Sequence, residues 1–319
     1  MKKRQFVATL ALAASACFSA FSASAQETQL RLVVPYPAGG SSDLAARIIG
    51  NELQSRLGQT VIVENMAGAG GRLALQNIKR MPADANVLVL VNPALMVIMP
   101  QVLKDAGYNV TADFQPISQV ASYEMALAVG AAVPVRETKH LLAWMRTNPE
   151  KANFGVPATG SIPHFFALML SEAAGVNVPV VGYKGSAPLV NDLVGGHVAV
   201  AVDALDSLLP LHQGGKLRIL ATSGEKRSIS TIPTFKEADL KLTAIGWNAF
   251  YAKSGMAPDK AARLAKEIGE IMQKPAVRER FVTAKVEPVS ANQAQTRATI
   301  DAFAKQWIPV IQKSGIKLD

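Results

Sequence analysis

The chain has 319 residues, a single cysteine (Cys17) and a formal net charge of +9. One cysteine excludes a small fold held by several disulfides, and if Cys17 leaves with a cleaved leader it also excludes thiol chemistry in the mature protein. The basic residues are scattered and do not alternate with aromatic ones, so the composition argues against a nucleic-acid partner.

The first 25 residues have the features of a secretory signal peptide. Residues 2–4 form a cationic head, residues 6–21 are apolar or small, and residues 23–25 read Ala-Ser-Ala, a small-x-small cleavage site. A membrane anchor would need ~20 predominantly apolar residues, and this run is shorter. We therefore expect cleavage after Ala25 and a mature chain in the periplasm; a lipid anchor at Cys17 is the weaker alternative.

The mature chain alternates short aliphatic runs with amphipathic stretches. In open α/β proteins this alternation indicates a mostly parallel sheet with helices on both faces. Two successive α/β units, with helices closing the C-terminal end, predict two lobes, with the chain crossing between them near residues 120–128 and 235–250. Strands are predicted at 30–34, 61–63, 87–91, 126–129, 153–156, 178–181, 198–202 and 217–221, and helices at 44–57, 72–80, 140–147, 163–174, 187–193, 261–272 and 292–314.

A glycine-rich loop, residues 37–43, follows the first predicted strand and enters a helix. Ligands of open α/β sheets bind outside the carboxyl ends of the strands, and a helix start offers N–H groups that suit a carboxylate or phosphate. An ordinary strand-to-helix turn uses the same residue types, so this loop alone does not distinguish a ligand-binding loop from such a turn.

Two further loops of this kind occur, at residues 68–71 and 158–161. Neither of the first two loops matches the lysine-containing phosphate loop, and the second has Leu73 where the dinucleotide fingerprint requires glycine. We therefore expect no nucleotide cofactor. Three donor-rich helix starts, spread over both halves, favour two lobes that grip a small anion.

The sequence offers little for catalysis or metal binding. The four histidines are scattered without metal-binding spacing, and no Gly-x-Ser-x-Gly motif occurs. Asp43, Asp203 and Asp206 could act as bases, but an aspartate in such a position more often caps a helix. The prediction is a protein without catalytic residues, metal or cofactor.

Several segments resemble those of Bug-type (TctC-like) receptors, the periplasmic substrate-binding components of tripartite tricarboxylate transporters. The resemblance runs in order along essentially the whole mature chain. It rests on residues 34–43, 64–71, 154–164, 183–188, 192–203, 215–218, 232–237, Trp247 and 257–258.

This resemblance implies a type II-like, two-lobed periplasmic binding fold that closes on a small carboxylate, held mainly by backbone N–H groups and hydroxyls. It implies permease subunits as partners, and we expect a monomer. Lobe 1 is expected at residues 26–125 and 246–319, and lobe 2 at residues 126–245. The expected ligand contacts are Tyr36, Pro37, Ala38, Gly39, Ser41, Ser42, Asp43, Asn65, Gly68, Ala69, Gly70, Thr159, Gly160, Ser161, His164 and Asp203.

Alternatives stay open at this level. A secreted α/β hydrolase or isomerase that acts on an acidic molecule is one, and a ligand sensor for a membrane kinase is another. Dicarboxylates, amino acids and aromatic acids all remain as ligands. Asp203, at the end of a predicted strand, is a candidate for setting specificity, with helix capping as the equal alternative.

Overall fold

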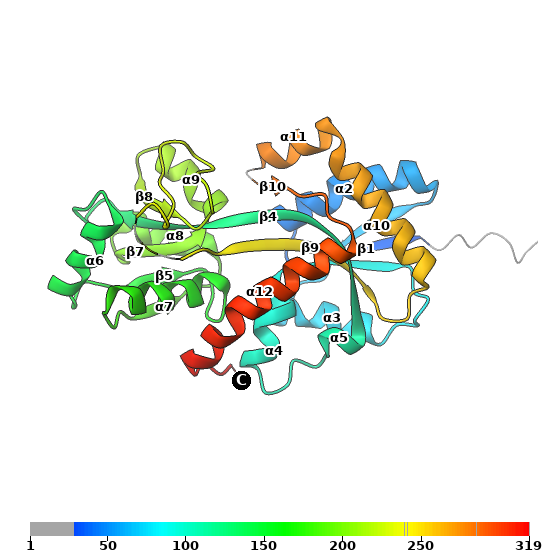
Figure 1. Ribbon diagram of the computed structural model, residues 1–319, viewed down its shortest axis with the longest axis horizontal. Coiled ribbons are helices and arrows are strands. Elements are labelled where there is room, and N and C mark those ends of the chain that lie inside the picture. The colour runs from blue at the N-terminus through cyan, green and yellow to red at the C-terminus, as the bar shows by residue number, and fades with distance from the viewer. Residues whose placement is uncertain (1–28, 239, 241, 285, 319) are drawn as a thin grey trace, which may run out of the picture.

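A computed structural model of the chain describes residues 29–238, 240, 242–284 and 286–318 (Figure 1). The predicted signal peptide and Cys17 lie outside the described residues. Among the described helices, none is both long enough and apolar enough to cross a membrane.

The strands join into one continuous sheet that runs through both halves of the molecule. Their bounds are β1 Leu30–Val34, β2 Val61–Asn65, β3 Val87–Val91, β4 Phe114–Gly130, β5 Phe154–Val156, β6 Val180–Gly182, β7 Val200–Ala204, β8 Leu217–Thr222, β9 Ile245–Lys253 and β10 Glu287–Pro288. The order is β2-β1-β3-β9-β4-β7-β5-β6, with β8 and β10 also pairing with β4. The confirmed fold class is therefore mixed α/β with a helix-flanked sheet.

Helices cover this sheet and connect its strands. The α-helices are α2 Ser41–Leu57, α3 Arg72–Lys79, α4 Met99–Val102, α5 Val110–Asp113, α6 Thr138–Thr147, α7 Ile162–Ala174, α8 Ser186–Gly195, α9 Leu205–Gln213, α10 Pro258–Gln273, α11 Pro275–Thr283 and α12 Gln293–Ser314. A short 3-10 turn, η1 (Ala69–Gly71), precedes α3, and a π-helical turn, η2 (Ala94–Ile98), precedes α4.

The first half is built on three parallel strands, because β1 pairs with β2 on one side and β3 on the other. All five residues of β3, Val-Leu-Val-Leu-Val, are buried, as expected for a strand covered on both faces. The late strand β9 then adds antiparallel to β3. Chain from the C-terminal third thus completes the sheet of the first half.

The second half repeats the parallel arrangement in a different order. β5 lies between β6 and β7, parallel to both, and β7 pairs antiparallel with the second part of β4. The first part of β4 pairs with β9. The 17-residue β4 is therefore shared by both halves (Figure 1).

Ser223 joins the two chain segments that connect the halves. Its hydroxyl accepts the N–H of Met125 at 2.8 Å and donates to the carbonyl of Ala244. Its own N–H donates to the Met125 carbonyl at 2.9 Å. The outgoing strand and the returning segment are thereby held side by side at the junction.

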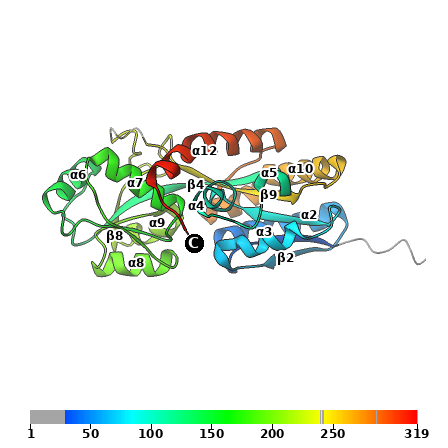
Figure 2. The same ribbon diagram turned by 90° about the horizontal axis from the view of Figure 1, so that it is seen from below.

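Helix α12 crosses the junction on one side of the molecule and packs against both η2 of the first half and α7 of the second (Figure 2). Trp247 of β9 packs edge-on against Phe303, and Phe303 stacks on Trp307. Both tryptophans are buried, so this aromatic row anchors α12 to the sheet.

The sequence-based elements differ from the structure at the junction and in helices that were not predicted, among them α4, α5 and α9. The strand predicted at 126–129 is only the end of β4, and β9 was not predicted. The expected lobe boundaries fall within β4 and at the start of β9, and they stay a prediction.

Candidate functional site

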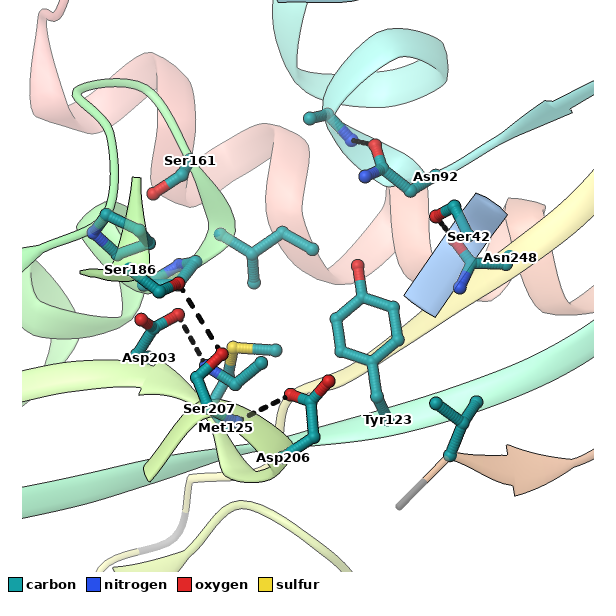
Figure 3. Close-up of a pocket in the computed structure, with 16 residues that line it drawn as sticks. Ser42, Asn92, Tyr123, Met125, Ser161, Ser186, Asp203, Asp206, Ser207 and Asn248 are labelled. Carbon is teal, nitrogen blue, oxygen red and sulfur yellow. Dashed lines mark hydrogen bonds between the residues drawn. The ribbon is translucent and has the colours of Figure 1, made fainter. Parts of the chain in front are cut away.

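A cavity of about 260 Å³ lies between the two halves, where the parallel strands of both halves end (Figure 3). Segments that follow β1, β3, β5 and β6, together with the end of β7, form most of its wall. This is the position where open α/β sheets bind ligands. The described residues that line it are Ser42, Asn92, Ala94, Tyr123, Met125, Pro157, Ser161, Ile162, Pro163, Ser186, Asp203, Ala204, Asp206, Ser207, Asn248 and Val286.

Asp43 fastens the first glycine loop to helix α2 behind the wall of the first half. Its side chain is buried, and Oδ2 accepts the N–H of Gly39 and Nε of Arg47, each at 3.0 Å, while Oδ1 accepts Nδ2 of Asn65 at 2.9 Å. Burial acts to raise the pKa of Asp43, but the hydrogen bonds from Arg47, Gly39 and Asn65 outweigh it and lower the pKa. The ionised carboxylate is therefore fully engaged within the protein.

Asn65, the last residue of β2, extends this network to the neighbouring strand. Its Nδ2 also donates to the carbonyl of Tyr36 at 3.1 Å, and its Oδ1 accepts Nη2 of Arg47 at 3.0 Å. The network fixes where α2 begins, so that Ser42 in its first turn reaches the cavity. There the Ser42 hydroxyl lies 3.5 Å from Oδ1 of Asn248.

The second glycine loop packs against the protein rather than lining this cavity. Gly70 has φ +67°, and a Cβ there would lie 2.5 Å from the Met99 methyl carbon. Gly71 has φ +97°, and its Cβ would lie 3.2 Å from the carbonyl oxygen of Pro35. The left-handed backbone favours glycine at both positions, and at Gly71 the close approach to Pro35, just after β1, favours it as well.

His164 holds the third loop, which enters α7. Its Nδ1 accepts the N–H of Gly160 at 2.8 Å, and its own backbone N–H donates to the hydroxyl of Ser161, the N-cap residue, at 3.3 Å. Burial lowers the pKa of His164, which keeps the imidazole neutral and Nδ1 able to accept. The histidine therefore positions Ser161 and the start of α7 at the cavity.

Two carboxyl groups face the cavity from the end of β7 and the first turn of α9 (Figure 3). Asp203 is 3% exposed; its Oδ1 accepts the N–H of Ala204 at 2.7 Å, whereas Oδ2 has no hydrogen-bond partner. Burial raises the pKa of Asp203 to about 7, and nearby Asp206 adds to the rise while Ser186 and Ala204 oppose it. Burial also raises the pKa of Asp206.

The strands β4 and β9 supply the rest of the polar lining. Tyr123 of β4 packs over Gly246, where a Cβ would lie 2.3 Å from the ring, and the phenol points into the cavity (Figure 3). Burial raises the pKa of Tyr123, with Asp206 and Asp203 contributing, so the phenol stays neutral. Asn248 of β9 is buried beside it.

Besides the two carboxyl groups, the described lining of the cavity offers neutral hydrogen-bond groups. None of the described residues that line it is a lysine or arginine. Four helices, α2, α7, α8 and α9, place residues of their first turn or N-cap on its wall, and their free N–H groups attract negative charge. In the described part of the chain, no group of three or more metal-ligating side chains is gathered.

The structure brings three of the predicted contact residues, Ser42, Ser161 and Asp203, onto the cavity wall. Ser41 is the first residue of α2. The others lie in the three loops or in the hydrogen bonds that support them. They are Tyr36, Pro37, Ala38, Gly39, Asp43, Asn65, Gly68, Ala69, Gly70, Thr159, Gly160 and His164. The role of every predicted residue as a ligand contact, including the three on the wall, stays a prediction.

Sequence reasoning missed other residues of the wall. Asn92, Ser186 and Ser207 follow or lie close after strands, and that position could have marked them. Tyr123 and Asn248 carry no such signal, because they lie inside strands whose place at the junction the sequence does not show.

The fold is that of the periplasmic binding proteins. The profile of the tripartite tricarboxylate transporter family receptors matches residues 45–316. The chain therefore belongs to this receptor family.

Individual relatives agree with that assignment. Protein BugT of Bordetella pertussis is 31% identical, with 98% of this chain and 96% of BugT covered. The R. palustris protein Rpa4515, solved with adipate, superposes with a TM-score of 0.82 at 28% identity, over 92% of this chain and 99% of that one. The periplasmic binding protein BugD superposes with a TM-score of 0.77 at 28% identity, over 91% and 98% of the two chains.

Proposed function

We propose that this protein is an exported periplasmic receptor that captures a small carboxylate between its two halves and delivers it to the permease subunits of a tripartite tricarboxylate-type transporter. The observation that carries the proposal is the meeting of four helix starts, from both halves, at one cavity. Family membership and the similar protein solved with adipate support the same reading.

Carboxylate binding without a cationic side chain has a physical basis here. The N–H groups of a helix's first turn have no partner within the helix, and the helix dipole adds partial positive charge. The hydroxyls of Ser42 and Ser161 and the amides of Asn92 and Asn248 add neutral donors. Hydrogen bonds to a charged acceptor are stronger than those between neutral groups.

The halves act, in this proposal, as lobes that close on the ligand. Residues 26–125 and 246–319 form the first lobe and residues 126–245 the second, so ligand contacts come from both. β4 and the segment returning to β9 form the connection about which they move, and the receptor works as a monomer.

The test is a thermal-shift series with dicarboxylates, amino acids and aromatic acids, because a ligand that binds only the folded state raises apparent stability. Ala94→Trp fills the cavity and should abolish the shift. Ala298→Trp, on an exposed part of α12, is the control and should keep it. An unchanged shift in a folded Ala94→Trp protein would place binding elsewhere.

A further inference from the structure

The cavity contains an acidic wall that a carboxylate ligand does not explain. Asp203 and Asp206 both line it, and the Oδ2 atom of Asp203 is buried without a hydrogen-bond partner. A buried polar atom in this condition costs free energy, and native proteins retain few of them. A hydrogen-bond donor that enters the cavity would satisfy this oxygen when the carboxyl group is ionised.

Among the described residues that line this cavity, none supplies a positive charge beside these aspartates. Tyr123 faces them from β4 and Ser186 from α8, and both are neutral donors or acceptors. Buried carboxylates normally have a paired cation or an equivalent set of hydrogen bonds. A positive charge that balances these two carboxylates would therefore come from the ligand.

We propose that the ligand carries a protonated amine as well as a carboxylate, and that Asp203 and Asp206 hold the ammonium group. The inference rests on the proposed function, because it assigns the ligand's second group within the same cavity. The carboxylate meets the starts of α2 and α7, marked by Ser42 and Ser161. The ammonium meets the carboxyl groups of Asp203 and Asp206, which already accept the N–H groups of Ala204 and Ser207 at the start of α9.

Charge complementarity separates this ligand from a dicarboxylate. A dianion would place a carboxylate beside two acidic side chains, with no cationic side chain among the described lining residues to offset the repulsion. It could bind there only if a proton were taken up between the ligand and Asp203. An ammonium donates to Oδ2 directly and needs no such proton.

The experiment compares pairs of ligands that differ only by an amino group: aspartate with succinate, glutamate with glutarate, and phenylalanine with 3-phenylpropionate. Isothermal titration should show that the amino member of at least one pair binds the unaltered protein at least about tenfold tighter than its partner. In Asp203→Asn that preference should shrink by a similar factor. Asp84→Asn, an exposed site outside the cavity, should keep it.

Each outcome bears on one claim. If the desamino member of each pair binds as tightly as the amino member, or more tightly, the ammonium assignment is wrong. The proposed receptor function would not be affected by that result. Desamino ligands that bind more tightly than their amino partners below about pH 7, and lose that affinity as pH rises, would show that protonated Asp203 donates to a ligand carboxylate, which also overturns the ammonium assignment. No binding by any carboxylate would contradict the proposed function itself.

Asp206→Asn provides a second route to the same answer. Its side chain is less buried than that of Asp203, so the variant disturbs packing less. It should also reduce the preference for the amino member. Unchanged preference in both folded aspartate variants would remove this wall from ligand recognition.

Discussion

The two halves contain one buried aspartate each near the cavity, and their surroundings have opposite effects on it. Asp43, behind the wall of the first half, is 5% exposed and bonded to Gly39, Arg47 and Asn65. Asp203, on the wall of the second half, is 3% exposed and leaves one oxygen unpartnered. The pKa of Asp43 is lowered and that of Asp203 is raised. Asp43 lies near the surface under the half-exposed Arg47, whereas Asp203 lies deep in the cavity wall.

A low exposed fraction therefore does not by itself determine the role of an acidic side chain near the cavity. A carboxylate whose partners lie within the chain stabilises a loop. A carboxylate that lacks a partner costs stability and is available to bind. The buried carboxylate of the first half thus has its hydrogen-bond partners without a ligand, whereas one oxygen of the carboxylate in the second half does not.

The largest expected effect is the pH dependence caused by Asp203. Its pKa is about 7 in the folded protein against about 3.9 unfolded, so the folded state binds the proton more tightly between these values. Stability should fall as pH rises through this window. Relative to Asp203→Asn, the unaltered protein should lose about 2 to 3 kcal/mol between about pH 5 and about pH 8.

Urea unfolding of both proteins at the two pH values measures this difference. Comparison with the variant cancels groups shared by both, including Asp206 to the extent that it titrates independently. A difference that does not change with pH would mean that Asp203 has a partner in solution, and the contrast between the halves would disappear.

Removal of Asp43 should produce the next largest effect. Asp43→Ala leaves the Gly39 N–H and the Asn65 amide without their acceptor and should lower the free energy of unfolding by about 2 kcal/mol at neutral pH. The lowered pKa means that this stabilisation is lost as pH falls through the folded value. Asp259→Ala, an exposed first-turn acid of α10, is the control and should cost less than about 1 kcal/mol.

What the sequence could predict depends on whether a feature is determined by neighbouring residues or by distant ones. Strands such as β1 and β3 were predicted with their observed bounds, because their aliphatic runs are local signals. The position of Ser42, Ser161 and Asp203 followed from the rule that ligands bind where parallel strands end. These features depend on residues close together in the chain.

The rest depends on contacts between distant segments. The bonds of Asp43 include one to Asn65, 22 positions away, and no spacing rule distinguishes that aspartate from Asp203. The pairing of β9 with both β3 and β4 brings Asn248 to the cavity from the C-terminal third. Which carboxyl has a partner is decided by the fold, and only the structure shows it.

Replacement of Ser161 should have the smallest effect on stability. This residue both caps a helix and lines the cavity. Its hydroxyl accepts the His164 N–H as the N-cap of α7, and the residue also lines the cavity. Ser161→Ala should cost about 1 kcal/mol of stability. Asn292→Ala, which removes the N-cap of α12 away from the cavity, should cost a similar amount.

Replacement of the two N-cap residues, Ser161 and Asn292, should affect ligand binding differently. A serine that accepts from the helix still has its own proton to donate, so Ser161 can serve the helix and a ligand carboxylate together. Ser161→Ala should weaken the binding of whichever carboxylate gives the largest thermal shift by about fivefold, whereas Asn292→Ala should leave the affinity unchanged. Ser161→Thr keeps both hydroxyl functions and should restore most of the loss. Equal affinities in all three variants would restrict Ser161 to capping and assign carboxylate binding to the backbone N–H groups of the helix starts.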